Sequence, residues 1–186
     1  LAGGLSEFPH EIFGLAETLE ILDLSGNALA ALPDDLPRLH KLRILFCSDN
    51  QFTELPAVLG QCAELEMVGF KANRIELVPA AALPPRLRWL ILTDNQVVEL
   101  PPEIGRCTRL QKLMLAGNRL QSLPPEMANC TWLELLRIAA NQLAALPDWL
   151  LRLPKLSWLA YAGNPFCPDV PGQSAISPIH WDDLHV

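Results

Sequence analysis

The sequence predicts an α/β solenoid, a chain wound into successive coils that each add one short strand to a single parallel sheet. The first observation is a column of seven asparagines spaced by 22 or 23 residues: Asn27, Asn50, Asn73, Asn95, Asn118, Asn141 and Asn164. The second is a leucine frame around each asparagine, for example Leu110, Leu113, Leu115, Asn118, Leu120, Leu123 and Pro124. Periods of about 20 to 50 residues are typical of solenoids, in which no unit buries its apolar face alone.

Three parts of the chain follow from this period. Residues 1–18 are predicted to be a partial N-terminal repeat or cap, because their apolar residues match the second half of a repeat: Leu5, Phe8, Pro9, Ile12 and Leu15. Residues 19–167 hold seven repeats, of which the last is a cap with Phe166 as its expected lid. Residues 168–186 are predicted to be a Pro/Gly/Ser linker and the start of a possible further domain.

Each repeat is expected to contribute one strand and one return segment. In the segment LxxLxL the second and third leucines point to one side and the intervening residues to the other, as in a β-strand. Strands stacked about 4.8 Å apart form a parallel sheet, and the leucines of all coils merge into one core. A proline column fixes φ on the return segments and predicts extended chain or short 3₁₀ turns there: Pro33, Pro56, Pro79, Pro101, Pro124 and Pro147.

The return segments are bulkier than the strands, so the solenoid is expected to bend with its sheet on the concave side. The asparagine side chains are expected to satisfy backbone groups where the chain leaves each strand. One interval, between Asn73 and Asn95, has 22 residues in place of 23. Its return segment, residues 78–87, contains Pro84 and Pro85 and is one residue short, which predicts a local deviation on the outer face.

The composition argues against two kinds of partner. A net charge of -7 with no Lys/Arg run disfavours nucleic acid, because binding to a phosphate backbone depends on clustered cations. No apolar stretch approaches the roughly 20 residues that span a bilayer, so membrane insertion is not expected.

Four of the five cysteines fall on core columns of the repeat: Cys47, Cys62, Cys107 and Cys130. They are interpreted as small core hydrophobes. An odd count, without the cysteine clusters that cap secreted repeat proteins, favours a reducing interior and therefore a cytoplasmic location. A bridge between Cys107 and Cys130 is the alternative, because adjacent coils stack about 5 Å apart.

No catalytic, metal or cofactor site is predicted for this chain. The sequence has no Gly-rich phosphate loop, paired metal motif or nucleophile elbow. Ser25 and Ser48 face outward, but no His lies beside them in the repeat columns, and a nucleophile without a base is not a site. His180 and His185, with the aspartates between them, match no strong metal motif.

Recognition is the remaining function, and it is expected at the outward strand positions. The first outward column is apolar at six of seven positions: Ile21, Ile44, Met67, Trp89, Lys112, Leu135 and Trp158. The second column is Asp23, Phe46, Gly69, Ile91, Met114, Arg137 and Ala160. Together they predict a partner-binding band on the concave face, made of Ile44, Phe46, Met67, Trp89, Ile91, Lys112, Met114, Leu135, Arg137 and Trp158.

Two alternatives concern this face. Neighbouring side chains can shield one another, so that the band mainly contributes cross-strand packing. Beside the band, a column alternates in sign across four strands: Glu20, Arg43, Glu66 and Arg88. Exposed pairs are worth little, so this column indicates a stabilising ladder more than a binding code.

The pattern LxxLxLxxNxLxxLP, which covers residues 5–167, resembles leucine-rich-repeat proteins of the 23-residue class. That resemblance implies a right-handed horseshoe with its parallel sheet on the concave face. More narrowly, residues 159–166 (LAYAGNPF), residues 179–181 (IHW) and residues 86–93 (RLRWLILT) are similar to the repeat domain of bacterial leucine-rich-repeat Ser/Thr protein kinases. Because no Gly-rich loop, catalytic Lys or HRD sequence is present, this resemblance implies only that the parent chain continues into a kinase.

The leading hypothesis is a non-catalytic interaction domain that holds a protein, a peptide or an attached domain of the same chain, as the regulatory or targeting segment of a larger signalling protein. One alternative is the regulatory domain of an ATP-binding bacterial Ser/Thr kinase. Another is the substrate-binding domain of a bacterial effector ubiquitin ligase. The residues after Val186 distinguish them, because a kinase needs a Gly-rich loop and such a ligase needs a catalytic cysteine.

Overall fold

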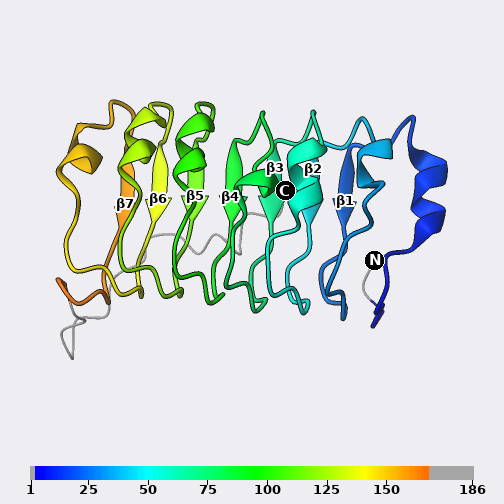
Figure 1. Cartoon of the computed structure of the whole chain (residues 1–186), viewed down its shortest axis with the longest axis horizontal. Coiled ribbons are helices and arrows are strands. Elements are labelled where there is room, and N and C mark those ends of the chain that lie inside the picture. Colours follow the sequence, from blue (N-terminus) through cyan, green and yellow to red (C-terminus); the bar gives the residue numbers. More distant parts are fainter. Residues whose placement is uncertain (1–2, 168–186) are drawn as a thin grey trace.

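The computed structural model describes residues 3–167, which form one row of coils (Figure 1). The strands are β1 (Ile21–Asp23), β2 (Ile44–Phe46), β3 (Met67–Gly69), β4 (Trp89–Ile91), β5 (Lys112–Met114), β6 (Leu135–Arg137) and β7 (Trp158–Ala160). The helices are all of the 3₁₀ type: η1 (His10–Leu15), η2 (Leu36–Arg38), η3 (Ala57–Gln61), η4 (Ala80–Ala82), η5 (Pro102–Arg106), η6 (Pro125–Asn129) and η7 (Asp148–Arg152). The predicted linker and possible further domain, residues 168–186, lie outside the described residues.

The strands form one seven-stranded parallel sheet in the order β1 to β7. Each strand residue pairs with the residue one repeat further along the chain, as Ile21 does with Ile44. The shortened interval leaves this register intact, because Met67 still pairs with Trp89. The missing residue is taken from the return segment that contains η4, because this segment lies between Asn73 and Trp89 and the strands on both sides keep their pairing. The predicted deviation on the outer face is therefore confirmed. The sheet itself cannot absorb the missing residue, because a one-residue slip would turn every side chain of a strand to the wrong face.

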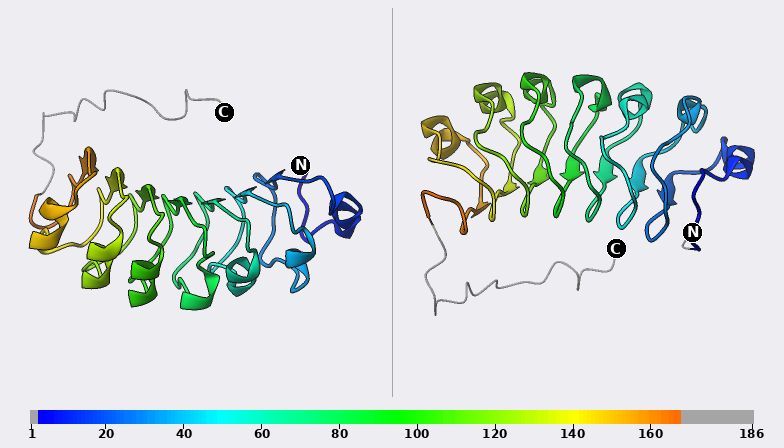
Figure 2. Two further views of the ribbon diagram at one scale, coloured as in Figure 1. Left: turned by 90° about the horizontal axis from the view of Figure 1, so that it is seen from above. Right: turned by 60° about the horizontal axis from the view of Figure 1, so that its bottom comes forward.

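The row of coils forms a shallow arc (Figure 2). In the view from above, the strands lie along its inner side and the 3₁₀ helices along its outer side. A proline directly precedes six of the seven helices: Pro9, Pro56, Pro79, Pro101, Pro124 and Pro147. Proline fixes φ and has no N–H to donate, so each return segment stays extended until the helix begins. The predicted concave sheet and short return turns are confirmed.

The leucines of successive coils form one continuous core. The central strand leucines Leu45, Leu90 and Leu113 are fully buried. Two repeats place phenylalanine in the core, where Phe52 and Phe70 meet edge to face with ring centroids 5.0 Å apart. Each coil therefore depends on its two neighbours for burial of its apolar side chains.

The asparagine column forms a ladder of hydrogen bonds between coils. Asn118 shows the arrangement: its Oδ1 accepts from the backbone N–H of Val97 at 2.9 Å, and its Nδ2 donates to the carbonyls of Leu92 and Leu115 at 2.9 and 3.0 Å. The same three kinds of bond are made by Asn50, Asn73, Asn95 and Asn141. All five side chains are only 6–8% exposed, so each amide satisfies backbone groups that water does not reach.

A second column, which was not predicted from the sequence, directly precedes the asparagines. Its seven residues have positive φ values between 52° and 73°: Gly26, Asp49, Ala72, Asp94, Gly117, Ala140 and Gly163. Glycine adopts this left-handed conformation freely, whereas the two alanines carry a steric cost of about 1 kcal/mol each. Gly and Asp occupy five of the seven positions, which is the sequence signal for this turn.

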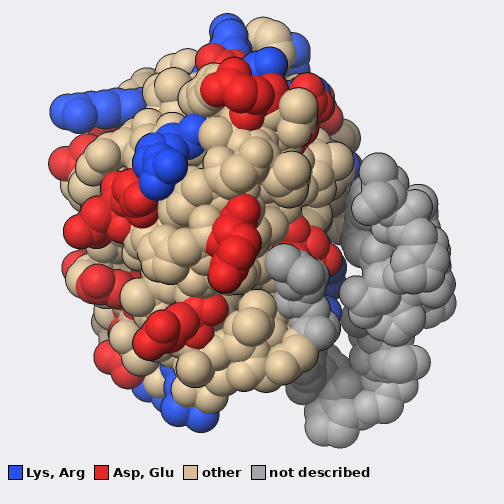
Figure 3. Space-filling view, turned by 90° about the vertical axis from the view of Figure 1, so that its right-hand side faces the viewer, with Lys and Arg blue, Asp and Glu red and all other residues tan. Residues whose placement is uncertain are grey.

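The N-terminal residues form half a coil that covers the first repeat. The backbone N–H of Leu5 donates to Asn27 Oδ1 at 3.0 Å, as later coils donate to the later asparagines. Leu15, at the end of η1, is 51% exposed, whereas three other apolar side chains are buried against the core: Phe8, Ile12 and Phe13. Figure 3 shows this end of the molecule as a surface of mostly uncharged residues, with Asp and Glu side chains spread over it and Lys and Arg side chains mainly toward its margins.

The last described coil extends the ladder and is more open. Asn164 is 1% exposed, and its Nδ2 donates to the carbonyl of Tyr161 at 2.7 Å. Phe166 is partly buried against the core and stacks on Tyr161 with ring centroids 5.7 Å apart. The Phe166 side chain thus lies against this end of the core, where a lid was expected.

The five cysteines are free thiols, so the alternative bridge between Cys107 and Cys130 is not formed. Cys47, Cys62, Cys107 and Cys130 are buried, which confirms their predicted core positions. Burial raises the pKa of Cys62 and Cys107 to about 11, and burial together with the nearby Cys107 thiol raises the pKa of Cys130 to about 12. The pKa of Cys47 is raised further, by burial first and by Asp23 second. Within residues 3–167, no helix is long and apolar enough to cross a membrane.

Replacing one ladder asparagine is expected to destabilise the whole solenoid. Asn118→Ala leaves the buried N–H of Val97 without its acceptor and weakens the bonding of two buried carbonyls, so we expect the free energy of unfolding to fall by about 3 kcal/mol in denaturant titration. Asn129→Ala, at an exposed asparagine on η6, is the matched control and should cost less than about 0.5 kcal/mol. Equal losses in the two variants would show that the ladder has no special role.

The left-handed column gives two opposite expectations. In Gly117→Ala the new Cβ would lie 2.4 Å from Asp94 Oδ1 at a φ of 70°, so we expect a loss of about 2 kcal/mol in unfolding free energy. Ala140→Gly removes strain at a φ of 52° and is expected to raise stability by up to about 1 kcal/mol. Thermal and denaturant unfolding of both variants check this, and a stabilising Gly117→Ala would contradict it.

Thiol reactivity reports on the packed core. At a pH of about 8, the four buried cysteines stay protonated because their pKa values are raised, and only Cys167 is expected to react quickly with a thiol reagent. Denaturation should expose all five thiols. In Cys167→Ser the fast phase should disappear, and its persistence would show that the core opens readily.

Candidate partner-binding surface

The outward side chains of the strands form the concave surface. Parallel pairing in register carries the first column across the sheet as Ile21, Ile44, Met67, Trp89, Lys112, Leu135 and Trp158. It carries the second as Asp23, Phe46, Gly69, Ile91, Met114, Arg137 and Ala160. The structure therefore brings all ten predicted contact residues, here called the concave band, onto one face of one sheet.

The members of the concave band differ in how much surface they offer. Eight are partly buried: Ile44, Phe46, Met67, Trp89, Ile91, Lys112, Arg137 and Trp158. Met114 and Leu135 are only 7% and 3% exposed, so these two predicted contact residues offer little surface to a partner. Larger side chains flank Leu135 on both adjacent strands, Lys112 on one side and Trp158 on the other, and strands about 4.8 Å apart leave little space between such neighbours.

Two contacts show how neighbouring side chains shield one another. A Cβ at Gly69 would lie 2.6 Å from Cδ1 of Phe46, so the Phe46 ring occupies the space that a side chain at Gly69 would fill. The Nζ of Lys112 lies 3.9 Å from the centroid of the Trp89 ring, in a cation–π contact. Burial is the main cause that lowers the pKa of Lys112. Cross-strand packing and an apolar surface thus coexist on this face.

One exposed apolar residue of the first column was not predicted as a contact. Ile21 on the edge strand β1 is 58% exposed, more than any other large apolar residue of the two columns. An edge strand has a neighbour on one side only, so its side chains are less covered. The exposure of Ile21 could have been predicted from the sequence, because its strand is the first of the repeat series.

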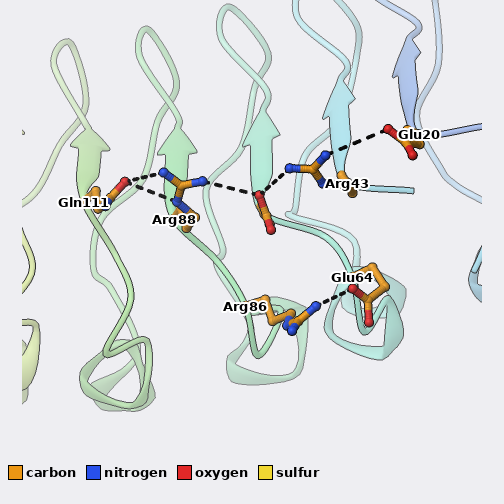
Figure 4. Close-up of polar contacts among 7 residues, drawn as sticks. Glu20, Arg43, Glu64, Arg86, Arg88 and Gln111 are labelled. Atoms are coloured by element: carbon orange, nitrogen blue, oxygen red, sulfur yellow. Dashed lines mark hydrogen bonds and ion pairs between the residues drawn. The ribbon is translucent and has the colours of Figure 1, made fainter. Parts of the chain in front are cut away.

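A polar ladder borders the concave band at the beginning of the strands. Figure 4 shows it running from Glu20 to Gln111 across five coils. Arg43 Nη1 lies 3.8 Å from a carboxylate oxygen of Glu20, and Arg43 Nη2 lies 3.2 Å from Glu66 Oε2. Arg88 Nη1 lies 3.5 Å from the same Glu66 oxygen, and Arg88 Nη2 donates to Gln111 Oε1 at 2.9 Å. The predicted ladder is confirmed, and its charges are largely neutralised within it.

Three other kinds of feature were possible sites among the described residues: metal-ligating groups, outward hydroxyls and surface hollows. In residues 3–167, no group of three His, Cys, Asp or Glu side chains could hold a metal ion. Ser25 Oγ accepts from the backbone N–H of Ser48 at 3.1 Å, which is a structural contact between coils. Two hollows of about 280 and 440 Å³ lie on the convex side beside η5, away from the concave band.

Comparison with known families agrees with this geometry. A family model described as "Leucine rich repeat" matches residues 85–143 and 108–166, and a second model of the same description matches residues 18–39. The chain belongs to the leucine-rich-repeat proteins. Its seven strands and seven in-register asparagines are the structural form of those repeats.

Several leucine-rich-repeat proteins are similar to this chain. The transforming growth factor beta activator LRRC32 of Mus musculus is 36% identical over 80 residues, which is 43% of this chain and 12% of LRRC32. The human leucine-rich repeat-containing protein 58 is 37% identical over 87 residues, which is 44% of this chain and 21% of that protein. The solved leucine-rich-repeat protein LIC12759 of Leptospira interrogans is 30% identical, with a TM-score of 0.66 over 87% of this chain and 47% of that one. The chain spans less than half the length of each.

Proposed function

We propose that this chain is a non-catalytic interaction domain that binds a protein or peptide through its concave band. The observation that carries the proposal is a set of large apolar side chains on three adjacent strands, all partly accessible: Ile44, Phe46, Met67, Trp89 and Ile91. Aromatic residues and methionine are enriched in interface cores, and contiguous apolar patches on a soluble fold mark contact surfaces.

The similar proteins support a role in protein recognition. LRRC32 is named as an activator of transforming growth factor beta, so its activity is directed at another protein. The shared part is the repeat series, which in this chain presents the concave band, and no group of three metal-ligating side chains lies among residues 3–167. An interaction domain within a signalling protein is consistent with both facts.

We also propose a reducing, cytoplasmic setting. Its support is the five free thiols, because a secreted chain of this size usually joins its cysteines in disulfides. Fractionation of cells that produce the tagged protein tests it, and recovery outside the cytoplasm would contradict it.

A regulatory role in a longer protein kinase is the second candidate. It is favoured by 33% identity over 91 residues with the probable inactive serine/threonine-protein kinase roco10 of Dictyostelium discoideum, of which the match covers 3%. The concave band would then hold the attached kinase domain or its substrate. A Gly-rich ATP-binding loop in the gene after Val186 would support this role, and a stop codon there would contradict it.

Charged substitutions in the band are expected to remove binding without unfolding the domain. In the double variant Trp89→Glu with Ile91→Glu, two half-buried anchors on β4 are replaced, and we expect a loss of about 100-fold in affinity. The probe is a peptide selected by phage display on the native chain, and its affinity is measured by fluorescence anisotropy.

The matched control places the same change elsewhere. Leu77 and Val98 are 51% and 49% exposed and lie outside the concave columns, so Leu77→Glu with Val98→Glu should keep full affinity. Circular dichroism verifies that both double variants are folded. Unchanged affinity in the β4 variant would show that the peptide does not bind the concave band.

A further inference from the structure

The last described coil leaves part of its apolar surface open. Leu156 and Leu159 are only partly buried, whereas their counterparts one coil earlier, Leu133 and Leu136, are fully buried. A hollow of about 220 Å³ lies beside them and is lined mainly by leucine side chains from η7 to β7. Leu151 on η7 is 73% exposed. One more layer is needed to bury this end of the core, because each coil is covered only by its neighbours.

The sheet also ends at this coil, since β7 has a neighbouring strand on one side only among residues 3–167. The Trp158 N–H donates to the carbonyl of Glu134 at 3.0 Å, and the Ala160 carbonyl accepts from the N–H of Ile138 at 2.8 Å. Alternate residues of a parallel strand bond to opposite neighbours, so the backbone groups of Leu159 point away from β6. The edge of β7 can therefore pair with one more parallel strand.

The repeat period continues beyond Cys167, into residues 168–186, which lie outside the described part of the chain. Four residues there are apolar and follow an apolar residue of the last coil by one repeat of 23: Ile176 after Leu153, Ile179 after Leu156, Trp181 after Trp158 and Leu184 after Tyr161. The composition of residues 168–178 predicted a linker. A linker alone gives no reason for apolar residues to keep the columns of the repeat.

The departures from the period are those of a terminal coil. Polar residues replace leucines at three inward positions: Asp169 for Leu146, Gln173 for Leu150 and Asp182 for Leu159. Between two coils such side chains would be buried without partners, at a high cost. A terminal coil has a neighbour on one side only, so its polar side chains reach water at the end of the row. Capping repeats with a polar outer face are atypical in this way.

We propose that residues 168–186 form an eighth, capping coil whose strand, residues 181–183, pairs in parallel and in register with β7. Ile176 and Ile179 then cover the hollow at the end of the leucine core. The segment follows the last described coil directly, so it docks within one molecule at a high effective concentration. The inference does not depend on the proposed function, although Trp181 would add one residue to the first outward column.

A disulfide bridge between introduced cysteines tests the register. Ser157 is exposed just before β7 and His180 lies one repeat later, so their Cα atoms would be about 4.8 Å apart, a distance that a disulfide can span. In Ser157→Cys with His180→Cys, made together with Cys167→Ser, we expect oxidised glutathione to join the two introduced thiols within one molecule. Non-reducing electrophoresis and peptide mass spectrometry measure the rate.

The matched control is Ser157→Cys with His185→Cys in the same Cys167→Ser background, which places the second thiol beyond the proposed strand. It should form its bridge about tenfold more slowly or less. Equal rates in the two variants would overturn the capping coil. A bridge that joins two molecules would also overturn it, because a second copy would then occupy the edge of β7.

Hydrogen exchange provides a second measurement without introduced cysteines. In Ile179→Ser with Trp181→Ser, we expect the backbone N–H of Leu159 to exchange about tenfold faster or more than in the native chain, because its strand loses its new neighbour. The amides of β4 should keep their native rates. Ser174→Ala with Ser177→Ala changes the same segment outside the four apolar columns and should leave β7 unaffected. Unchanged exchange at Leu159 in the first variant would contradict the proposal.

Discussion

Each coil of this protein must leave its strand and turn outward, and at that point backbone groups lose their partners in the sheet. The asparagine ladder supplies the missing partners, since each buried amide accepts from one coil and donates to carbonyls of two. The left-handed residue before each asparagine makes the turn that brings the amide into place. The left-handed residue and the asparagine after it recur in every coil and fix where the next strand begins. The register of the sheet and the shape of the concave face therefore depend on this pair.

The same constraint explains why irregularity is found only on the outer side. The interval that lacks one residue keeps its strand in register and has the shorter return segment, because a shift in the sheet would expose core leucines. Both ends of the row use the ladder as well, through Asn27 at the first coil and Asn164 at the last. The outer face can thus vary in sequence and length while the inner face remains a constant platform.

The concave face combines packing with accessible apolar surface. Phe46 fills the space above Gly69, and Lys112 lies over the Trp89 ring, so these side chains are held in position before any partner arrives. Immobilised side chains lose less conformational entropy on binding, which favours recognition by such a surface. The fold alone does not specify a function, because function depends on the side chains that a fold presents.

The sequence by itself determined the solenoid, the core positions of four cysteines and the membership of each outward column, because a strict period assigns every residue the same environment in each coil. It did not determine how much of each outward side chain is accessible. Met114 and Leu135 are buried although they occupy outward positions, and Ile21 is exposed. The left-handed turn was also hidden at Ala72 and Ala140, whose residue type does not favour it. Accessibility and strain depend on the neighbours across adjacent strands and coils, and only the tertiary structure brings those neighbours together.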